Sequence, residues 1–204
     1  MIGMTAPHAL VRVSMRLLAL VVGMVFGGCG RSAPAAKPAP EAKLIGTTPP
    51  EWKLERWLSS PPLTLASLRG SVALVRWWTA GCPYCSASAP ALRTFDRKYG
   101  ARGLRVIGVY HHKEDTPFDP AVYEDTAKQY GFTFPVAFDP DWRTLESWMR
   151  DRKGNVVDTG FTSVTFVIDK HGVVRHVHPG GEYKDGDPGY VELERVIEKL
   201  LAEN

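Results

Sequence analysis

Apolar runs of strand length alternate with segments of helical apolar periodicity from residue 72 onward. Short β-branched runs predict strands at about 72–78, 104–110, 134–138, 164–169 and 173–177, the last two joined as a hairpin. Apolar residues three or four positions apart predict a helix that ends at Tyr99 and helices at about 120–130, 141–149 and 190–201. This alternation predicts an α/β domain, a central mixed β-sheet flanked by helices on both faces.

The N-terminal leader has a different pattern. Two arginines precede an apolar run at 17–26, which ends in two glycines and Cys29. This arrangement is typical of a secretory signal peptide, here residues 1–28, and the run is shorter than the roughly 20 residues of a membrane-spanning helix. The ending resembles a bacterial lipobox, with Phe26 where an aliphatic residue is usual, so Cys29 is the predicted lipidation site. A plain cleaved signal or an uncleaved anchor is the alternative.

Composition divides the rest of the chain into a linker and a domain. Residues 29–45 are rich in alanine and proline, which predicts an extended, lipidated linker. Residues 46–204 are enough for one domain with its own core. The chain has 25 basic and 22 acidic residues, and without the two leader arginines the net charge is +1. That balance argues against nucleic-acid binding, for which strongly basic domains are typical.

The three cysteines carry the candidate chemistry. Cys29 belongs to the leader, while Cys82 and Cys85 lie in the segment WWTAGCPYC between a predicted strand and a predicted helix. No second pair has zinc-site spacing, so a structural zinc site is not predicted. No metal and no other cofactor is expected for the leading function. A helix N-terminus favours a thiolate, which predicts Cys82 as the exposed nucleophile and Cys85 as the resolving thiol. A structural disulfide is the alternative, but so short a loop removes little unfolded-state entropy.

The order of these motifs resembles the thioredoxin-like superfamily, specifically the exported thiol-disulfide oxidoreductases of the TlpA/ResA type. The matching segments cover most of residues 48–204, namely Pro49–Trp52, Leu63–Gly70, Trp77–Cys85, Val106–Val109 and Thr165–Asp169. The resemblance implies a thioredoxin-like fold and an enzyme that exchanges disulfides with exported proteins, as a reductase. It also implies a bacterial periplasmic or cell-envelope location, a membrane thiol reductant or oxidant as redox partner, and membrane attachment through the lipid.

Residues next to the pair are predicted to support it. Pro83 shapes the turn, and Tyr84 provides an exposed aromatic flank, as in the similar CPYC of glutaredoxins. Either Trp77 or Trp78 should flank the cysteines, because strand neighbours face opposite ways.

Three positions depart from the family pattern. The cis-proline that faces the cysteines in the family falls on Ser163, next to Thr162. The family has an acidic residue three positions after the second cysteine, where this chain has Ser88. The buried acid of thioredoxin corresponds to Arg76. Both usual proton acceptors are therefore replaced, and Arg76 either stabilises a thiolate or points to the surface.

Two other functions stay open. Thr79, three residues before Cys82, matches part of the peroxiredoxin motif, although that motif's proline and arginine fall on Val75 and Ser163. A copper-binding chaperone would use the two thiols with a histidine, from 111–112 or from the alternating pair at 176 and 178. Related copper carriers have three residues between their cysteines, whereas this chain has two.

Overall fold

The computed structural model describes residues 38–203 of the 204-residue chain. The predicted signal peptide, Cys29 and most of the predicted linker lie outside these residues and stay predictions. In the part described, no helix has both the length and the apolar character that crossing a membrane requires.

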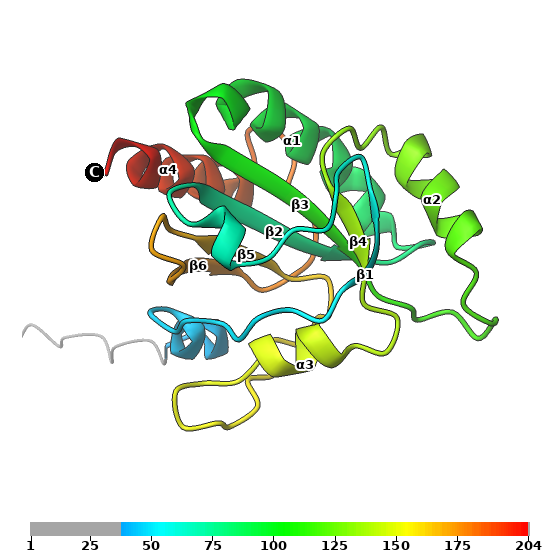
Figure 1. Cartoon of the computed structure of the whole chain (residues 1–204). Coiled ribbons are helices and arrows are strands. Elements are labelled where there is room, and N and C mark those ends of the chain that lie inside the picture. The colour runs from blue at the N-terminus through cyan, green and yellow to red at the C-terminus, as the bar shows by residue number, and fades with distance from the viewer. Residues whose placement is uncertain (1–37, 204) are drawn as a thin grey trace, which may run out of the picture. The chain divides into compact units, whose positions relative to one another are not determined.

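A six-stranded mixed sheet forms the centre of the described residues (Figure 1). Its strands lie in the order β1-β4-β3-β2-β5-β6. The β2–β3 and β3–β4 pairs are parallel, and the other three pairs are antiparallel. The bounds are Glu55–Leu58 (β1), Val72–Trp78 (β2), Leu104–Tyr110 (β3), Val136–Phe138 (β4), Thr165–Ile168 (β5) and Val174–His178 (β6). The predicted mixed sheet and its terminal hairpin are confirmed.

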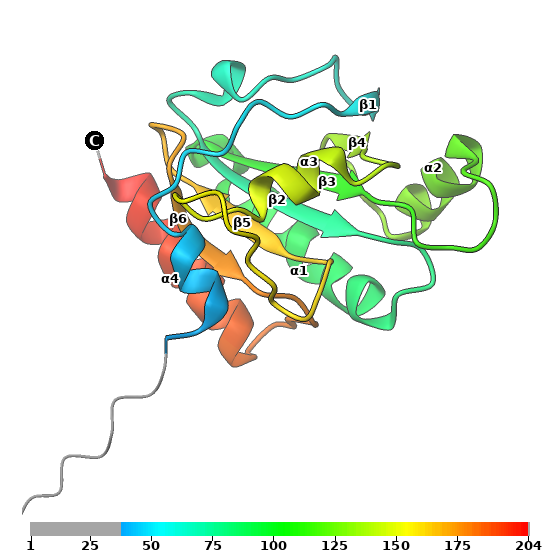
Figure 2. The ribbon, with the colours of Figure 1, turned by 90° about the horizontal axis from the view of Figure 1, so that it is seen from below.

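Helices cover both faces of the sheet (Figures 1 and 2). Side chains of α1, α2 and α4 pack into one core layer, and those of α3 and of the short 3₁₀ helices η1 and η2 pack into the other. The bounds are Pro83–Tyr99 (α1), Pro120–Gln129 (α2), Arg143–Trp148 (α3), Pro188–Ala202 (α4), Pro40–Leu44 (η1), Ala66–Leu68 (η2) and Gly100–Arg102 (η3). The predicted fold class is therefore confirmed.

Strand β2 separates the two core layers by the alternation of its side chains. Leu74 and Trp78 pack with α1, whereas Trp77 faces the other layer, where its ring centre is 5.0 Å from that of Trp148. Arg76 is two positions from both Leu74 and Trp78, so its cation points into the layer under α1. This strand thus brings a charged group toward the helix that carries the cysteines.

Three of the elements that differ from the expectation have a local backbone cause. β1 is an additional edge strand of mixed composition, and the positive φ of Arg56 (40°) interrupts its regular alternation. β4 begins at Val136 rather than near 134, because Pro135 has no N–H for the ladder. α3 begins at Arg143 rather than 141, because Trp142 has a left-handed backbone with φ of 63°. Each difference follows from a local backbone restriction that hydrophobic periodicity does not record.

Candidate active site

Cys82 and Cys85 lie at the N-terminus of α1, just beyond the end of β2. Cys82 is the N-cap residue, and its sulfur accepts a hydrogen bond from the backbone N–H of Cys85 at 3.3 Å. Pro83 occupies the first helical position, where its missing N–H costs no hydrogen bond. Gly81 has φ of +66°, which permits the sharp turn before the helix. As a result Cys82 is partly exposed and Cys85 is buried, both as free thiols.

The Cys85 thiol lies among polar and charged groups. Its sulfur is 3.2 Å from Oγ of Ser163, the residue at the family's proline position. Burial raises the pKa of Cys85, while the Arg76 cation and the Ser163 hydrogen bond act to lower it. Burial has the larger effect, so the pKa of Cys85 is raised overall. Cys85 therefore depends on its neighbours to lose a proton.

Arg76 is buried in the layer under α1 and does not point to the surface. Its guanidinium donates to Oγ1 of Thr165 at 3.2 Å and to the carbonyl of Gly181 at 2.9 Å. It also lies 5.2 Å from the ring centre of Tyr183. These partners are all neutral, and Nε has no partner among the described residues. Such a cation is costly to bury, so its presence within electrostatic reach of Cys85 requires a functional explanation.

The aromatic residues near the pair divide between core and surface. Trp78 is buried in the same core cluster as Cys85, and it meets three aromatic rings edge-on at 5.2 to 5.7 Å. It is therefore the tryptophan on the cysteine side of the sheet. Tyr84 is 47% exposed, and its ring lies edge-on to Phe161 at 6.4 Å.

A pocket of about 460 Å³ opens at the Cys82 sulfur, and we call it the redox pocket. The loop before β5 forms part of its lining, and there Oγ1 of Thr162 is 2.9 Å from Nε2 of the buried His111. Arg76 and Trp78 lie in the core and not in this lining. The pocket brings together the other predicted site residues of the domain that are not fully buried: Cys82, Pro83, Tyr84, Thr162 and Ser163.

Glu114 also lines the redox pocket, and no sequence pattern indicated it. Its carboxylate accepts hydrogen bonds from Oγ1 of Thr79 at 2.9 Å and from the Tyr110 hydroxyl at 2.7 Å. Burial acts to raise the pKa of Glu114, but these and other hydrogen bonds hold it below its ordinary value. The available signal was its place after the carboxyl end of β3, where α/β proteins gather functional side chains. The hydroxyl of Thr79, the threonine of the peroxidase alternative, is therefore engaged as a hydrogen-bond donor to Glu114.

The histidines are dispersed through the structure. His111 and His178 each bury Nδ1 without a partner among residues 38–203. Burial lowers the pKa of His111 to about 3 and that of His178 to about 4. Within those residues, no group of three or more His, Cys, Asp or Glu side chains is placed to hold a metal ion. Within the described residues, a copper site would therefore have the two thiols but no histidine group placed beside them.

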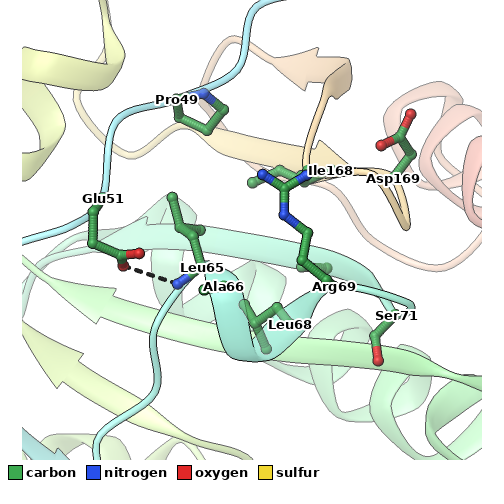
Figure 3. Close-up of a pocket in the computed structure, with 11 residues that line it drawn as sticks. Pro49, Glu51, Leu65, Ala66, Leu68, Arg69, Ser71, Ile168 and Asp169 are labelled. Atoms are coloured by element: carbon green, nitrogen blue, oxygen red, sulfur yellow. Dashed lines mark hydrogen bonds between the residues drawn. The ribbon is translucent and has the colours of Figure 1, made fainter.

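A separate hollow of about 220 Å³ lies at the other end of β2 (Figure 3). Glu51 borders it and accepts a hydrogen bond from the backbone N–H of Leu65 at 2.8 Å. The Arg69 side chain extends toward the turn between β5 and β6, where Gly172 leaves room for its guanidinium. Because Ala73 near the start of β2 lines this hollow, it is distinct from the redox pocket.

Known proteins resemble this chain in sequence and in fold. A family model described as Redoxin matches residues 34–193. The chain belongs to the Redoxin family. This redoxin is 29% identical to Protein DipZ of Mycobacterium bovis over 168 residues, which cover 80% of the chain and 22% of DipZ. It is 24% identical to thiol-disulfide oxidoreductase ResA of Geobacillus kaustophilus over 160 residues, which cover 78% of the chain and 79% of ResA. The redoxin thus spans about a fifth of DipZ and most of ResA.

Solved structures share the fold of this redoxin. A thioredoxin-like protein in its oxidized form is 26% identical, with a TM-score of 0.61, and the match covers 79% of the redoxin and 99% of that chain. A Chlorobium tepidum protein, provisionally named thiol:disulfide interchange protein DsbE, is 23% identical, with a TM-score of 0.60, and the match covers 78% of the redoxin and 98% of that chain. The predicted thioredoxin-like fold and the TlpA/ResA-type resemblance are confirmed. The predicted enzyme class, a thiol-disulfide oxidoreductase, agrees with the name of the ResA relative.

Proposed function

We propose that this redoxin reduces disulfides of exported proteins through Cys82 and Cys85, while a lipid on Cys29 tethers it to a membrane. The observation that carries the proposal is the pair itself, a partly exposed sulfur at a helix N-terminus with a buried thiol one turn inward. Similarity to a protein named thiol-disulfide oxidoreductase supports the chemistry. The leader pattern supports export and lipidation.

The exchange takes place in two steps. In the first, the Cys82 thiolate attacks a substrate disulfide, forms a mixed disulfide and releases one substrate thiolate, which takes up a proton. In the second, Cys85 loses its proton and attacks the Cys82 sulfur. The second substrate thiolate then leaves, and the Cys82–Cys85 disulfide forms. Two electrons have passed to the substrate, and a membrane thiol reductant restores the dithiol by the same exchange in reverse.

The neighbouring residues have separate roles in this scheme. Arg76 and Ser163 stabilise the Cys85 thiolate, because both act to lower the pKa of Cys85. Pro83 fixes the turn, and Tyr84 borders the redox pocket. Thr162, held by its contact with His111, keeps the facing loop at the cysteines. Trp78 supports the end of β2 through its edge-on aromatic contacts.

We place the protein in the bacterial periplasm or cell envelope. The leader is the observation that supports this location, since residues 1–28 have the pattern of an export signal. Such compartments are oxidising, so a working dithiol there needs a continuous supply of electrons. A membrane thiol reductant meets that need, and a lipid anchor keeps the redoxin near it.

The reduction potential of the pair decides the direction of exchange. The family resemblance favours a reductase. Equilibration of the mature protein with dithiothreitol and glutathione buffers gives the potential. A value near about −270 mV is expected for a reductase, and one near about −120 mV would overturn the reductive direction.

Single cysteine variants test the roles of the two thiols. We expect reduced Cys85→Ser to accumulate a mixed disulfide with a disulfide-bonded substrate such as insulin, because its resolving thiol is missing. Cys82→Ser should form none. Insulin reduction by the double serine variant at the wild-type rate would show that the pair is not the active site. Peroxide consumption without insulin reduction would instead favour the thiol peroxidase.

A further inference from the structure

Ser88 and Arg76, which replace the two acids of the family pattern, both contact the loop between β6 and α4. This loop, residues 179–187, has no regular secondary structure, and three of its residues are glycines with positive φ. We call it the β6–α4 loop. Glycines restrict a backbone very little, so the position of the loop depends on its contacts with the rest of the domain.

Tyr183 makes the main contacts between the β6–α4 loop and the core. It is the one buried residue from 181 to 189. Its backbone N–H donates to Oγ of Ser88 at 3.1 Å, and its hydroxyl is 3.2 Å from Oγ1 of Thr165. The buried Ser88 hydroxyl in turn donates to the carbonyl of Tyr84 at 2.8 Å, which fixes its orientation. Helix α1 therefore holds the loop through Ser88.

The β6–α4 loop also holds the Arg76 guanidinium. Gly181 accepts a hydrogen bond from this guanidinium at 2.9 Å, and the ring of Tyr183 lies beside it, with the ring centre at 5.2 Å. The hydroxyl of Thr165, which also accepts from Arg76, is the one that meets the Tyr183 hydroxyl. Each of these contacts of the cation thus lies on the loop or bonds to it.

The position of Arg76 matters because it is the charged neighbour of Cys85 during resolution. Among the described residues, the titratable side chains within electrostatic reach of Cys85 are those of Cys82, Arg76, Tyr130 and Tyr183. Burial raises the pKa of both tyrosines, so they are neutral at pH 7, and Cys82 has no charge while it is part of a mixed disulfide. The attraction between a cation and a thiolate weakens as they separate, so a displaced Arg76 stabilises the Cys85 thiolate less.

We propose that Ser88 is a positioning residue for the resolving step, holding the β6–α4 loop so that Arg76 stays beside Cys85. The inference rests on the proposed function, in which Cys85 resolves a mixed disulfide. Ser88 acts through two contacts, first on Tyr183 and then on Arg76. Because Gly181 lines the redox pocket, the same hydrogen bond also fixes part of the pocket wall. The position at which the family has an acid thus contributes here by geometry and not by proton transfer.

Ellman's reagent, an aromatic disulfide, separates the two steps of exchange when it is mixed with an equimolar amount of the reduced, full mature protein. Attack by Cys82 releases one thionitrobenzoate and leaves a mixed disulfide. Attack by Cys85 then forms the Cys82–Cys85 disulfide and releases a second thionitrobenzoate. We expect Ser88→Ala to slow the second release about threefold at pH 7, the effect of raising the pKa of Cys85 by about one unit. At high pH, where Cys85 is ionised in both proteins, the two rates should converge.

Two further variants separate positioning from a general effect on the helix. Ser86→Ala is the matched control, because Ser86 is exposed on α1 and its hydroxyl donates to the carbonyl of Pro83 in the same helix at 2.9 Å. Its second release should keep the wild-type rate. Ser88→Ala added to Arg76→Met should slow that release no further than Arg76→Met alone, because the cation on which Ser88 acts is absent.

The outcomes distinguish this inference from the proposed function. A wild-type second release in Ser88→Ala, an equal loss in Ser86→Ala, or an undiminished loss in the Arg76→Met background would overturn the role given to Ser88. Absence of the first release from the wild type would instead overturn the proposed function.

Discussion

The Arg76 cation favours the ionised form of the nearby Cys85 thiol, whereas burial of that thiol opposes it and raises its pKa overall. Arg76 has neutral hydrogen-bond partners, and its cation opposes the effect of burial on the pKa of Cys85. Arg76→Met removes the charge and keeps an unbranched side chain. We expect this variant to slow the attack of Cys85 on the mixed disulfide at pH 7, about three- to fourfold for each unit by which the pKa of Cys85 rises, because the greater nucleophilicity of the thiolate partly offsets its smaller population.

Stopped-flow measurement of that resolving step across pH distinguishes a lost charge from a damaged fold. The rates of the wild type and of Arg76→Met should converge at high pH, where Cys85 is ionised in both. Arg76→Lys keeps a cation and should lie between them. Equal rates at pH 7, or a deficit that persists at high pH, would contradict the role given to Arg76.

His111 gives the protein an acid sensitivity whose sign follows from its burial. Burial lowers the pKa of His111 to about 3 from 6.5, so between these values the unfolded chain binds the proton and the folded chain does not. Its contribution to stability is present above pH 6.5 and is lost as pH falls toward 3. Between pH 6.5 and pH 5 we expect the free energy of unfolding to fall by roughly 2 kcal/mol more than in His111→Gln. Urea denaturation at both pH values measures this difference, and an equal fall in the two proteins would contradict it.

At the scale of elements, Pro90 lies at an exposed position inside α1, which runs unbroken from Pro83 to Tyr99. Proline has no N–H to donate to the carbonyl of Ser86, and its ring crowds the preceding turn. We therefore expect Pro90→Ala to raise the free energy of unfolding by about 1 to 3 kcal/mol, measured by thermal and urea denaturation. The insulin-reduction rate serves as the control for an intact N-terminus of α1. A stability unchanged or lowered by the substitution would show that the fold already accommodates the proline.

The elements that carry the cysteines were predictable because each has a strong local signal. The apolar run of β2 and the helical spacing in α1 place Cys82 and Cys85 at a strand-to-helix junction without any long-range information. The opposite wall of the site was not predictable in this way. Ser163 meets Cys85 across 78 positions of sequence, and Glu114 meets Thr79 across 35. Such contacts depend on how loops fold over the sheet edge, which periodicity does not record.

At the scale of the whole molecule, one face of the sheet is built around an unusual charge distribution. The layer under α1 holds the Arg76 cation together with the neutral groups of Thr165, Tyr183 and His178. The sequence showed that an arginine replaces the family's acid, and the burial of Arg76 rules out the surface interpretation. A buried cation raises the need for a nearby anion, and the Cys85 thiolate formed during resolution supplies one. The free-energy cost of burying Arg76 in the resting protein is therefore consistent with a role in the second step of exchange, where its cation stabilises the Cys85 thiolate.

We propose that a single residue outside the described structure, Cys29, attaches the whole protein to a membrane. Lipid on Cys29 would place the domain at the membrane through the linker of residues 29–45. We expect Cys29→Ser, expressed from the full-length chain in a bacterial host, to move the redoxin from the membrane fraction to the soluble fraction. The Cys82→Ser/Cys85→Ser variant is the matched control and should stay with the membrane, because its lipid site is intact. If Cys29→Ser stays in the membrane fraction after an alkaline wash, the leader acts as an uncleaved anchor and lipidation is not what holds the protein there.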